Sequence, residues 1–265
     1  MYRITVIMGI YNCALTLPEA LDSLLAQTYK NFKVILCDDG SKDNTYEVAK
    51  EYASKHDNIV LIQNDKNRGL NYTLNHCLEY VDTEYIARMD GDDLCDPTRF
   101  EKEIKFLDAH SKYAIVSCNM FHFDDNGIFR TSGNAEGEPK LSDFPKGTPF
   151  RHAPCMVRTT AMNDVGGYSV DDKLLRVEDY HLWIKMYVKG YKGYNLKEPL
   201  YMMRDDENAI ARRKWKGNVN EFYVKNLAVS MLGLPFYMHI YSLRPIITHC
   251  LPKWLYKILH KKFAK

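Results

Sequence analysis

The sequence predicts an α/β protein built on a mostly parallel, doubly wound, Rossmann-like sheet. Short apolar runs alternate four times with segments of helical periodicity in the first 110 of its 265 residues. The runs are apolar throughout, which is typical of parallel strands buried on both faces. Several of them end at polar clusters, and the carboxyl ends of parallel strands meet at one edge of such a sheet. We therefore expect these clusters to face a common crevice.

The first half of the chain divides into four strand–helix units. Strands are predicted at residues 4–9, 32–37, 59–62 and 85–89. The helices that follow them are predicted from residue 16, over about 44–55, from residue 69 and from residue 97. The first helix has Thr16 as a suitable N-cap and Pro18 in its first turn, where proline is tolerated.

The pattern changes after His110. A strand is predicted over 113–123 with a hairpin turn at Asn126-Gly127, and residues 131–150 are predicted to be a long loop of the kind that often forms a lid. A short strand at 156–157, a helix ending near 165 and a helix opened by Glu178-Asp179 complete the pattern. We expect a main domain over 1–215, with halves at about 1–110 and 111–215, and a basic helical extension over 216–265.

Charge is distributed unevenly along the chain. The net charge is only +2, yet residues from 211 onward carry 11 Lys and Arg against one acid, Glu221. An acidic body with a basic tail suggests two different tasks. We expect no nucleic-acid partner.

Seven cysteines, no two of them closer than 18 residues, make a disulfide framework or a Cys-x-x-Cys zinc site improbable. Reduced thiols in a cytoplasmic protein fit best. The N-terminus lacks a charged region followed by a cleavable apolar run, so it predicts a first strand and not a signal peptide.

The strongest chemical signal is Asp90-Gly91-Asp92-Asp93, which follows the fourth strand. Two carboxylates one residue apart can hold a hard divalent cation and leave positions open for phosphate oxygens. Such a cation would neutralise charge on a leaving diphosphate. The alternative is that Asp92 or Asp93 caps the helix near Pro97 while the others are solvated.

Polar residues also follow the first two strands. Asp38 and Asp39 could accept hydrogen bonds from a base or ribose, or they could form an Asx-turn with a helix N-cap. Tyr11, followed by Asn12, could stack on a base or be an ordinary surface tyrosine.

A further acidic pair, Glu178-Asp179, opens a helix in the second half. It could supply a general base that takes a proton from an attacking hydroxyl, or it could be a helix cap favoured by the helix dipole. His152 could contact a diphosphate or metal, or be a satisfied polar residue.

Taken together and in order, these segments resemble the inverting family 2 glycosyltransferases, which have the GT-A nucleotide-sugar fold. The matching segments are VIMGIYN, VILCDDGSKDN, NRGLNYTLNHCLE, EYIARMDGDDLCDPTRFEKEIKFL, HAPCMVR, GGY, VEDYHLWIKM and EPLYMMR. They cover roughly residues 3–205. Gly9 stands where the family often has proline, and the segment after Arg204 departs from the family pattern.

The resemblance implies a role for each matching residue. Tyr11, Asp38 and Asp39 would hold the base, typically uracil, with Arg68 near the nucleotide. Asp90 would bind ribose or assist the metal, and Asp92 would coordinate Mn²⁺ or Mg²⁺. Asp179 would be the catalytic base, and Glu178 would orient the base or the acceptor. In the segment that departs from the family, Arg212 and Arg213 could contact the diphosphate.

The sequence thus predicts a metal-dependent inverting glycosyltransferase, of hexosyl- or N-acetylhexosaminyl type. Its expected donor is a UDP-sugar and its expected acceptor a hydroxyl of a glycan or lipid-linked glycan in bacterial envelope polysaccharide synthesis. One alternative is a phosphatase of the haloacid dehalogenase type, in which an Asp-x-Asp supplies nucleophile and acid. The other is a nucleotide-sugar or glycan-binding module without catalysis.

The basic extension suggests where the protein acts. Residues 226–243 contain no charged side chain over 18 positions, but their polar residues, Gly233 and Pro235 argue against a membrane span. Residues 252–265 predict a basic amphipathic helix suited to an anionic membrane surface. We expect peripheral attachment at the inner face of the cell membrane; the alternative is a helix packed on the main domain.

Overall fold

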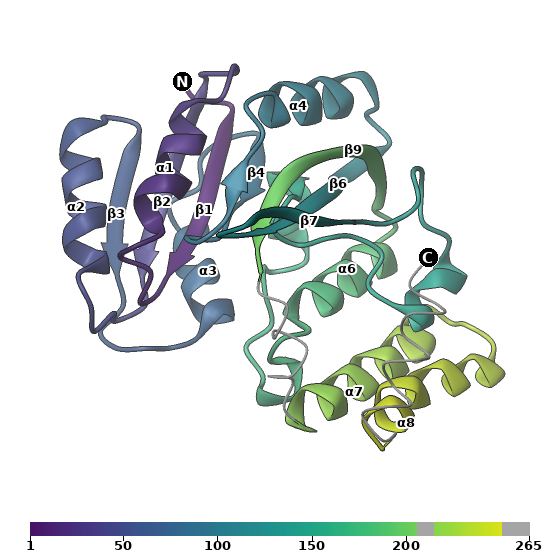
Figure 1. Ribbon diagram of the computed structural model, residues 1–265. Coiled ribbons are helices and arrows are strands. Elements are labelled where there is room, and N and C mark those ends of the chain that lie inside the picture. The colour runs from purple at the N-terminus through teal and green to yellow at the C-terminus, as the bar shows by residue number, and fades with distance from the viewer. Residues whose placement is uncertain (206–214, 251–265) are drawn as a thin grey trace.

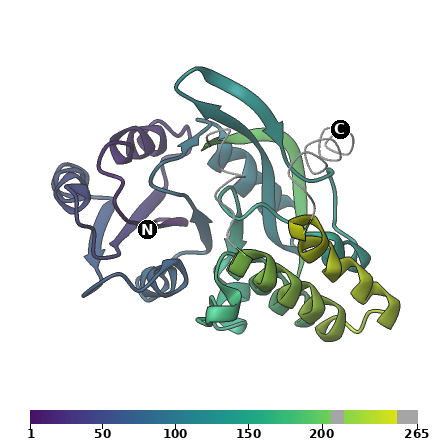
Figure 2. The ribbon, with the colours of Figure 1, turned by 60° about the horizontal axis from the view of Figure 1, so that its bottom comes forward.

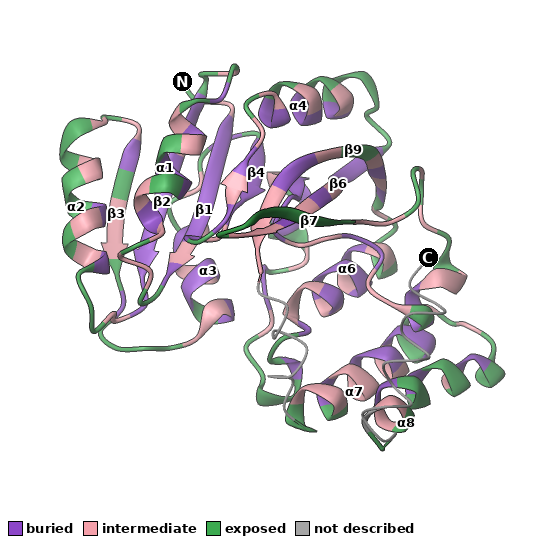
Figure 3. Cartoon of the chain, in the orientation of Figure 1, coloured by how far each residue is buried: buried purple, intermediate pink, exposed green. Residues whose placement is uncertain are grey.

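The computed structural model describes residues 1–205 and 215–250 (Figure 1). Its described residues form one mixed sheet with helices on both faces. The strand order is β3-β2-β1-β4-β8-β6-β9-β5, and β7 pairs with β6 outside this path. The strands are mostly buried (Figure 3), as expected for a sheet that is covered on both sides.

The first half of the chain confirms the predicted alternation of strands and helices. The strands β1 (Ile4–Ile10), β2 (Phe32–Asp38), β3 (Ile59–Gln63) and β4 (Tyr85–Arg88) are parallel. The helices are α1 (Leu17–Leu25), α2 (Thr45–Lys55), α3 (Leu70–Leu78) and α4 (Arg99–Ala109). Chain order 3-2-1-4 places the exits of β1 and β4 side by side, which positions the site described below.

Two apolar clusters hold the sheet between its helices. Alternating β1 side chains divide between them, with Val6 and Met8 in one cluster and Ile7 in the other. The first cluster packs under α1, α2 and α4. The second contains side chains of α3 and of α6 (Glu178–Val188), including the fully buried Trp183. Figure 2 shows helices on both sides of the strands, so the doubly wound prediction is confirmed.

The second half contains the predicted hairpin and a reversed strand. β6 (Tyr113–Asp124) and β7 (Gly127–Ser132) form the hairpin. β8 (Met156–Arg158) is antiparallel to both β4 and β6, and it leads into α5 (Thr159–Asp164).

Two strands were not predicted from the sequence. β9 (Lys192–Arg204) is parallel to β6, and its end pairs with β5 (Leu94–Cys95), directly after the acidic cluster. β9 contains lysines, a glutamate and Pro199, so it lacks the apolar run that marks β1–β4. The pairing with partners about 80 to 110 residues away compensates for its weak local pattern.

The prediction of one long loop over 131–150 is wrong in part. β7 extends to Ser132, Gly137 forms a bridge with Asn195, and residues 141–146 form the 3₁₀ helix η1 (Leu141–Lys146). Phe144 of η1 is fully buried, because its ring packs against Tyr187 of α6. That burial anchors a segment whose Gly, Pro and Ser content predicts mobility.

From residue 215, where the described part of the chain resumes, the chain is helical. α7 (Trp215–Met231) packs Val224 and Ala228 into the second apolar cluster and contacts η1, α6 and η2 (Asp172–Leu174). η4 (Phe236–Leu243) is a 3₁₀ helix, and α8 (Arg244–Cys250) follows it. Residues 226–243 are therefore interrupted after Met231, and no helix within 1–205 and 215–250 is long and apolar enough to cross a membrane. The predicted amphipathic helix over 252–265 lies outside the described residues.

Candidate active site

A pocket of about 450 Å³ opens at the carboxyl ends of β1 and β4. Its lining comes from two segments and two single residues that are far apart in the sequence. These are the exit of β1 (Gly9, Tyr11, Asn12, Cys13, Ala14, Leu15, Thr16), the acidic cluster after β4 (Asp90, Gly91, Asp92) and the separate residues Asp43 and Arg204. The structure thus brings together polar clusters that the parallel-sheet prediction placed at one edge.

The exit of β1 is fixed by hydrogen bonds to the exit of β2. The backbone N–H of Asn12 donates to Ser41 Oγ at 3.0 Å, and the N–H of Lys42 donates to Asn12 Oδ1 at 2.8 Å. Asn12 has a φ of 49°, a left-handed conformation that asparagine tolerates well. This turn leaves Tyr11 42% exposed beside the pocket, so its ring is free to stack on a ligand.

The two aspartates after β2 are buried and organise the neighbouring loops. Asp39 Oδ1 accepts from the N–H of Arg68 and from Asn64 Nδ2, both at 2.8 Å, and Oδ2 accepts from the N–H of Gly69 at 2.9 Å. Asp38 accepts from Gln63 Nε2 at 2.9 Å and from the Ser41 N–H at 3.3 Å. Asp38 thus binds the backbone three residues on, but the cap residue of α2 is Asn44, so the helix-cap part of the alternative is wrong. A contact of either carboxylate with a base stays a prediction.

Arg68 lies at the rim of this region, on the segment that Asp39 holds. Its side chain pairs with Asp65 at 2.9 Å and lies 4.8 Å from the centre of the Tyr72 ring. The guanidinium is exposed, and its predicted proximity to a nucleotide stays a prediction.

The acidic cluster after β4 faces the pocket. Asp90 accepts from Arg88 Nη2 at 2.5 Å, while Asp92 is exposed. Partial loss of hydration of the charged carboxylate and the negative charge of Asp90 raise the pKa of Asp92. Gly91 allows this turn to lie against the exit of β1, because a Cβ at that position would lie 2.9 Å from Cys13 Sγ.

Asp93 turns inward and ties the cluster to β9. Its Oδ2 accepts from Tyr201 Oη at 2.8 Å and its Oδ1 from the Arg204 N–H at 2.7 Å. The Tyr201 hydroxyl in turn accepts from the N–H of Asp90 at 3.2 Å. Burial and the charges of Asp90 and Asp92 raise the pKa of Asp93 to about 8. The helix-cap alternative is wrong for this cluster, because the cap residue of α4 is Thr98.

The pocket contains a cation that sequence reasoning missed. Arg204 donates through Nε to the carbonyl of Asp92 at 3.1 Å and pairs with Glu19 of α1. Its guanidinium lines the pocket and lies over the Phe123 ring. The signal in the sequence is the segment EPLYMMR, which ends at this residue, although only the later Arg212 and Arg213 are predicted to contact a diphosphate. Arg212 lies outside the described residues.

The donor set fits a divalent metal with open coordination positions. Asp90 and Asp92 present hard oxygen ligands, and after burial the negative charge of Asp90 is the next largest cause of the raised pKa of Asp92. A cation between them would relieve the repulsion between these charges. In the described part of the chain no three His, Cys, Asp or Glu side chains converge.

A second acidic pair lies at the start of α6. The cap residue of that helix is Val177, so Glu178 and Asp179 occupy its first turn and neither one is the cap. Burial and the adjacent charge of Glu178 raise the pKa of Asp179 to about 7, and burial raises that of Glu178. A carboxyl that titrates near neutrality can act as a general base.

Arg88, the last residue of β4, links the two acidic pairs. It binds Asp90 directly, and its positive charge opposes the rise in the pKa of Asp92, Glu178 and Asp179. The side chain is only 6% exposed, and its Nε has no hydrogen-bond partner among the described residues. An unpartnered N–H on the side chain that binds Asp90 fits a site that receives an oxygen-rich ligand.

His152 lies beneath this region. Its Nε2 is 2.8 Å from the Tyr168 hydroxyl, and its ring stands edge-on to Trp183. Burial and the charge of Arg88 hold the pKa of His152 well below its usual range, so the ring is neutral. The satisfied-histidine alternative is confirmed, and a contact with diphosphate or metal stays a prediction.

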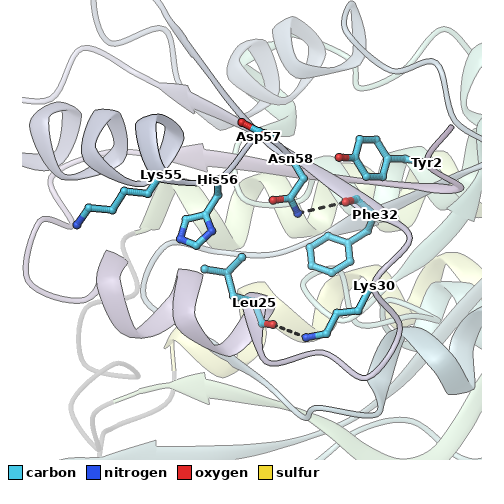
Figure 4. A pocket seen from close by; sticks show the side chains of 8 residues that line it. All are labelled: Tyr2, Leu25, Lys30, Phe32, Lys55, His56, Asp57 and Asn58. Atoms are coloured by element: carbon cyan, nitrogen blue, oxygen red, sulfur yellow. Dashed lines mark hydrogen bonds between the residues drawn. The ribbon is translucent and has the colours of Figure 1, made fainter.

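A second pocket, of about 380 Å³, lies at the opposite end of the sheet (Figure 4). Tyr2 and Phe32 line it near the amino ends of β1 and β2, together with Leu25 and Lys30. Its remaining lining residues are Lys55, His56, Asp57 and Asn58. Lys30 donates to the carbonyl of Leu25 at 2.7 Å, and the acidic pairs described above do not reach it. The candidate site is therefore the pocket at the carboxyl edge.

Comparison with known proteins identifies the family. The model of glycosyl transferase family 2 matches residues 5–169, which include the exits of β1, β2 and β4. The chain belongs to glycosyl transferase family 2. The phosphatase and the non-catalytic module are therefore set aside, and the chain is a glycosyltransferase.

Relatives match over nearly the whole of this family 2 chain. The glycosyltransferase EpsE of Bacillus subtilis (strain 168) is 41% identical over 261 residues, which are 98% of this chain and 94% of EpsE. The UDP-Glc:alpha-D-GlcNAc-diphosphoundecaprenol beta-1,3-glucosyltransferase WfaP of Escherichia coli is 24% identical over 94% of this chain and 96% of WfaP.

Solved structures confirm the GT-A fold. S. aureus TarS 1–349, solved in complex with UDP-GlcNAc, has a TM-score of 0.71 at 18% identity and covers 95% of this chain and 77% of its own. The mannosyltransferase PcManGT of Pyrobaculum calidifontis, solved with GDP-Man and Mn²⁺, has a TM-score of 0.63 at 19% identity, over 100% of this chain and 81% of its own.

Proposed function

We propose that this family 2 transferase moves a sugar from a UDP-sugar to a hydroxyl of a glycan or lipid-linked glycan, with inversion at the anomeric carbon. The observation that carries the proposal is the pairing of two acidic sites through Arg88. Asp90 and Asp92 lie at the pocket, and the charge of Arg88, which binds Asp90, also acts on Asp179, whose pKa is raised to about 7. The first acidic site could bind a donor diphosphate through a metal, and the second could accept the proton of an acceptor hydroxyl.

The nucleoside would lie along the exits of β1 and β2. Tyr11 would stack on the base beside Asn12, and the lone pairs of Asp38 and Asp39 not used by the loops would accept from base N–H groups. The support for uridine comes from relatives, since TarS was solved with UDP-GlcNAc and WfaP is named for UDP-Glc. Arg68 would approach the nucleotide from the rim.

The diphosphate would lie over the acidic cluster. Asp92, assisted by Asp90, would hold Mn²⁺ or Mg²⁺, and the neighbour PcManGT was solved with Mn²⁺. When bound, the metal would supply positive charge to the departing diphosphate. Arg204, fixed to the Asp92 carbonyl, would add a second positive charge on the opposite wall, and Arg212 would extend it. His152 would contribute a neutral polar contact from below.

Asp179 would act on the acceptor. In its ionised form the carboxylate takes the proton of the acceptor hydroxyl as that oxygen attacks the anomeric carbon from the face opposite the diphosphate. Single displacement of this kind inverts the configuration. Glu178 would orient the acceptor and, through its charge, keep the pKa of Asp179 high enough for proton transfer. The positive charge of Arg88 opposes the rise in the pKa of both acids.

The acceptor and location follow from the relatives and the basic extension. WfaP is named for a diphosphoundecaprenol acceptor, which is a lipid. We propose a lipid-linked glycan of envelope polysaccharide synthesis as the acceptor, reached from the cytoplasmic side. The lysine-rich residues 252–265 would attach the enzyme to the anionic inner face of the cell membrane.

The test is calorimetric titration of UDP into the purified protein with and without Mn²⁺. We expect binding that requires the metal and is lost in Asp92→Asn, because the amide cannot balance the cation's charge. Asp57→Asn is the matched control, since Asp57 is an exposed aspartate of the second pocket. No UDP binding in either condition would refute the uridine assignment, and equal binding by Asp92→Asn would refute the metal role of Asp92.

A further inference from the structure

The segment η4 carries an unusual concentration of exposed apolar side chains. Together with the first part of α8 it forms what we call the η4 surface. Its members and their exposed fractions are Phe236 (85%), Tyr237 (72%), Ile240 (65%), Tyr241 (39%), Leu243 (44%) and Ile247 (55%). In Figure 3 this stretch between α7 and α8 is largely coloured as exposed. Singly exposed apolar residues are ordinary, but six within twelve positions are not.

The polarity of η4 is inverted relative to an ordinary surface helix. Its inward side includes Ser242, which is 1% exposed and donates to the His239 carbonyl at 2.5 Å. His239 Nδ1 lies 2.5 Å from Asn226 Oδ1 of α7, and Met238 is the one apolar side chain of η4 that is buried. Polar contacts thus hold η4 against α7, and its apolar groups are turned outward. This arrangement costs free energy in water unless another apolar phase covers it.

The shape of the surface favours a soft partner. Five of the eight consecutive side chains of η4 are exposed, at positions that do not form a single stripe. The segment therefore projects its apolar groups outward in several directions. A rigid protein partner would need a matching cavity, whereas a bilayer interface deforms around inserted side chains. Phenylalanine and tyrosine are also well suited to the boundary between headgroups and acyl chains.

The charge of the C-terminal part of the chain favours a bilayer with anionic headgroups. Residues 222–265 contain no Asp or Glu, and the chain that continues from α8 carries Lys253, Lys257, Lys261, Lys262 and Lys265. Basic residues close to a membrane are attracted to anionic headgroups, and the absence of acids in this stretch leaves that attraction unopposed. Stable peripheral attachment generally needs two signals, one apolar and one electrostatic. The η4 surface supplies the apolar signal and the lysines supply the electrostatic one.

We infer that the η4 surface inserts into the interface of an anionic phospholipid bilayer. The inference deepens the proposed function and rests on it, since a lipid-linked acceptor gives the enzyme a reason to be there. In Figure 1 the arrowheads of β1 and β2 point downward, and α7 and α8 lie farther down on that side of the molecule. Insertion of the η4 surface would therefore bring the carboxyl edge of the sheet, where the pocket opens, toward the membrane.

The test is co-sedimentation of the full chain with vesicles of phosphatidylcholine and phosphatidylglycerol. The variant Phe236→Ser/Ile240→Ser removes two of the most exposed apolar groups. Its matched control is Ile128→Ser/Phe129→Ser on β7, where the side chains are 56% and 41% exposed. We expect the η4 variant to partition at least about tenfold more weakly than the wild type, because insertion energy scales with buried apolar area. The β7 control should partition like the wild type.

A second measurement locates the surface in the bilayer. In Tyr237→Trp the new indole should be quenched by brominated acyl chains, beyond the quenching of the wild-type tryptophans. Wild-type partitioning by the η4 variant, or the absence of additional quenching, would overturn the inference. So would a fall in the variant's mass by sedimentation equilibrium with unchanged partitioning, because the surface would then join two copies of the chain.

The experiments distinguish a failure of the membrane inference from a failure of the proposed function. UDP calorimetry is performed on the same variants, and we expect unchanged metal-dependent binding, since none of the substituted residues lines the donor pocket. Vesicle binding without UDP binding in the wild type would refute the donor assignment and leave the surface in place. UDP binding without any vesicle binding would refute the surface and leave the transferase proposal in place.

Discussion

The rate of sugar transfer should rise about tenfold between pH 6 and pH 8 because Asp179 must ionise to accept a proton. Its pKa of about 7 results from burial and from the charge of Glu178, with Arg88 opposing the shift. A carboxyl with that pKa is about one-tenth ionised at pH 6 and about nine-tenths ionised at pH 8. A base that works only when ionised gives a rate that follows this fraction.

The assay is UDP release with both donor and acceptor well below their KM, so that the profile reports the enzyme free of substrates. Glu178→Gln should move the inflection to lower pH, because removing the adjacent negative charge lowers the pKa of Asp179. Asp179→Asn should lose at least about 100-fold in rate at every pH, as expected for removal of a general base. It should still bind UDP with metal, because Asp179 does not line the donor pocket.

The free energy of unfolding should fall as the pH rises, mainly between about pH 4 and pH 7. The folded-state pKa of Asp179 lies above its unfolded value of 3.8, so the folded state binds more protons between about pH 4 and pH 7. The contribution of this carboxyl to the free energy of unfolding is therefore present below pH 4 and is lost as pH rises through 7.

A flat or falling transfer rate between pH 6 and 8, or an inflection unmoved in Glu178→Gln, would refute the assignment of Asp179 as base.

Two further predictions concern the support of the site. Gly91→Ala should destabilise the fold by about 1–3 kcal/mol in urea denaturation, because its Cβ would lie 2.9 Å from Cys13 Sγ. Adding Cys13→Ala should restore most of the loss, and failure to do so would contradict the steric explanation. Arg99→Met should cost about 3–5 kcal/mol at pH 8, since it leaves the fully buried Glu103 without its partner at 3.1 Å. The loss should shrink at pH 5, because the pKa of Glu103 is already about 7 beside Arg99; equal losses at both pH values would contradict this.

The first half of the fold was predictable because its signals are local. Each of β1–β4 is an apolar run, and each following helix repeats apolar residues at helical spacing, so short windows of sequence contain the information. β9 could not be predicted in the same way. Its strand conformation depends on β6 and β5, which supply the pairing and are distant in the sequence.

Some residues of the candidate site could likewise be predicted from local sequence, and others could not. Asp90, Asp92 and Asp179 are acids at the ends of regular elements. Because such positions are not part of the apolar core, acids there can be recognised as candidate functional residues from the sequence alone. Arg88 is a single arginine within an apolar strand, and Tyr201 lies in a run typical of a core. Only the packed structure shows that both hold the acidic cluster, because the relevant contacts are made by tertiary neighbours.

The hydrogen bonds from β9 to Asp93 have a consequence for synthesis on the ribosome. A nascent chain that has emerged only to residue 110 already contains β1, β4 and the acidic cluster. It still lacks Tyr201 and the Arg204 N–H, which are the partners of the Asp93 carboxylate. Contacts that close so large a loop form late in folding. We therefore expect the proposed donor binding to require the chain to at least residue 204, so that a prematurely terminated product does not sequester nucleotide-sugar.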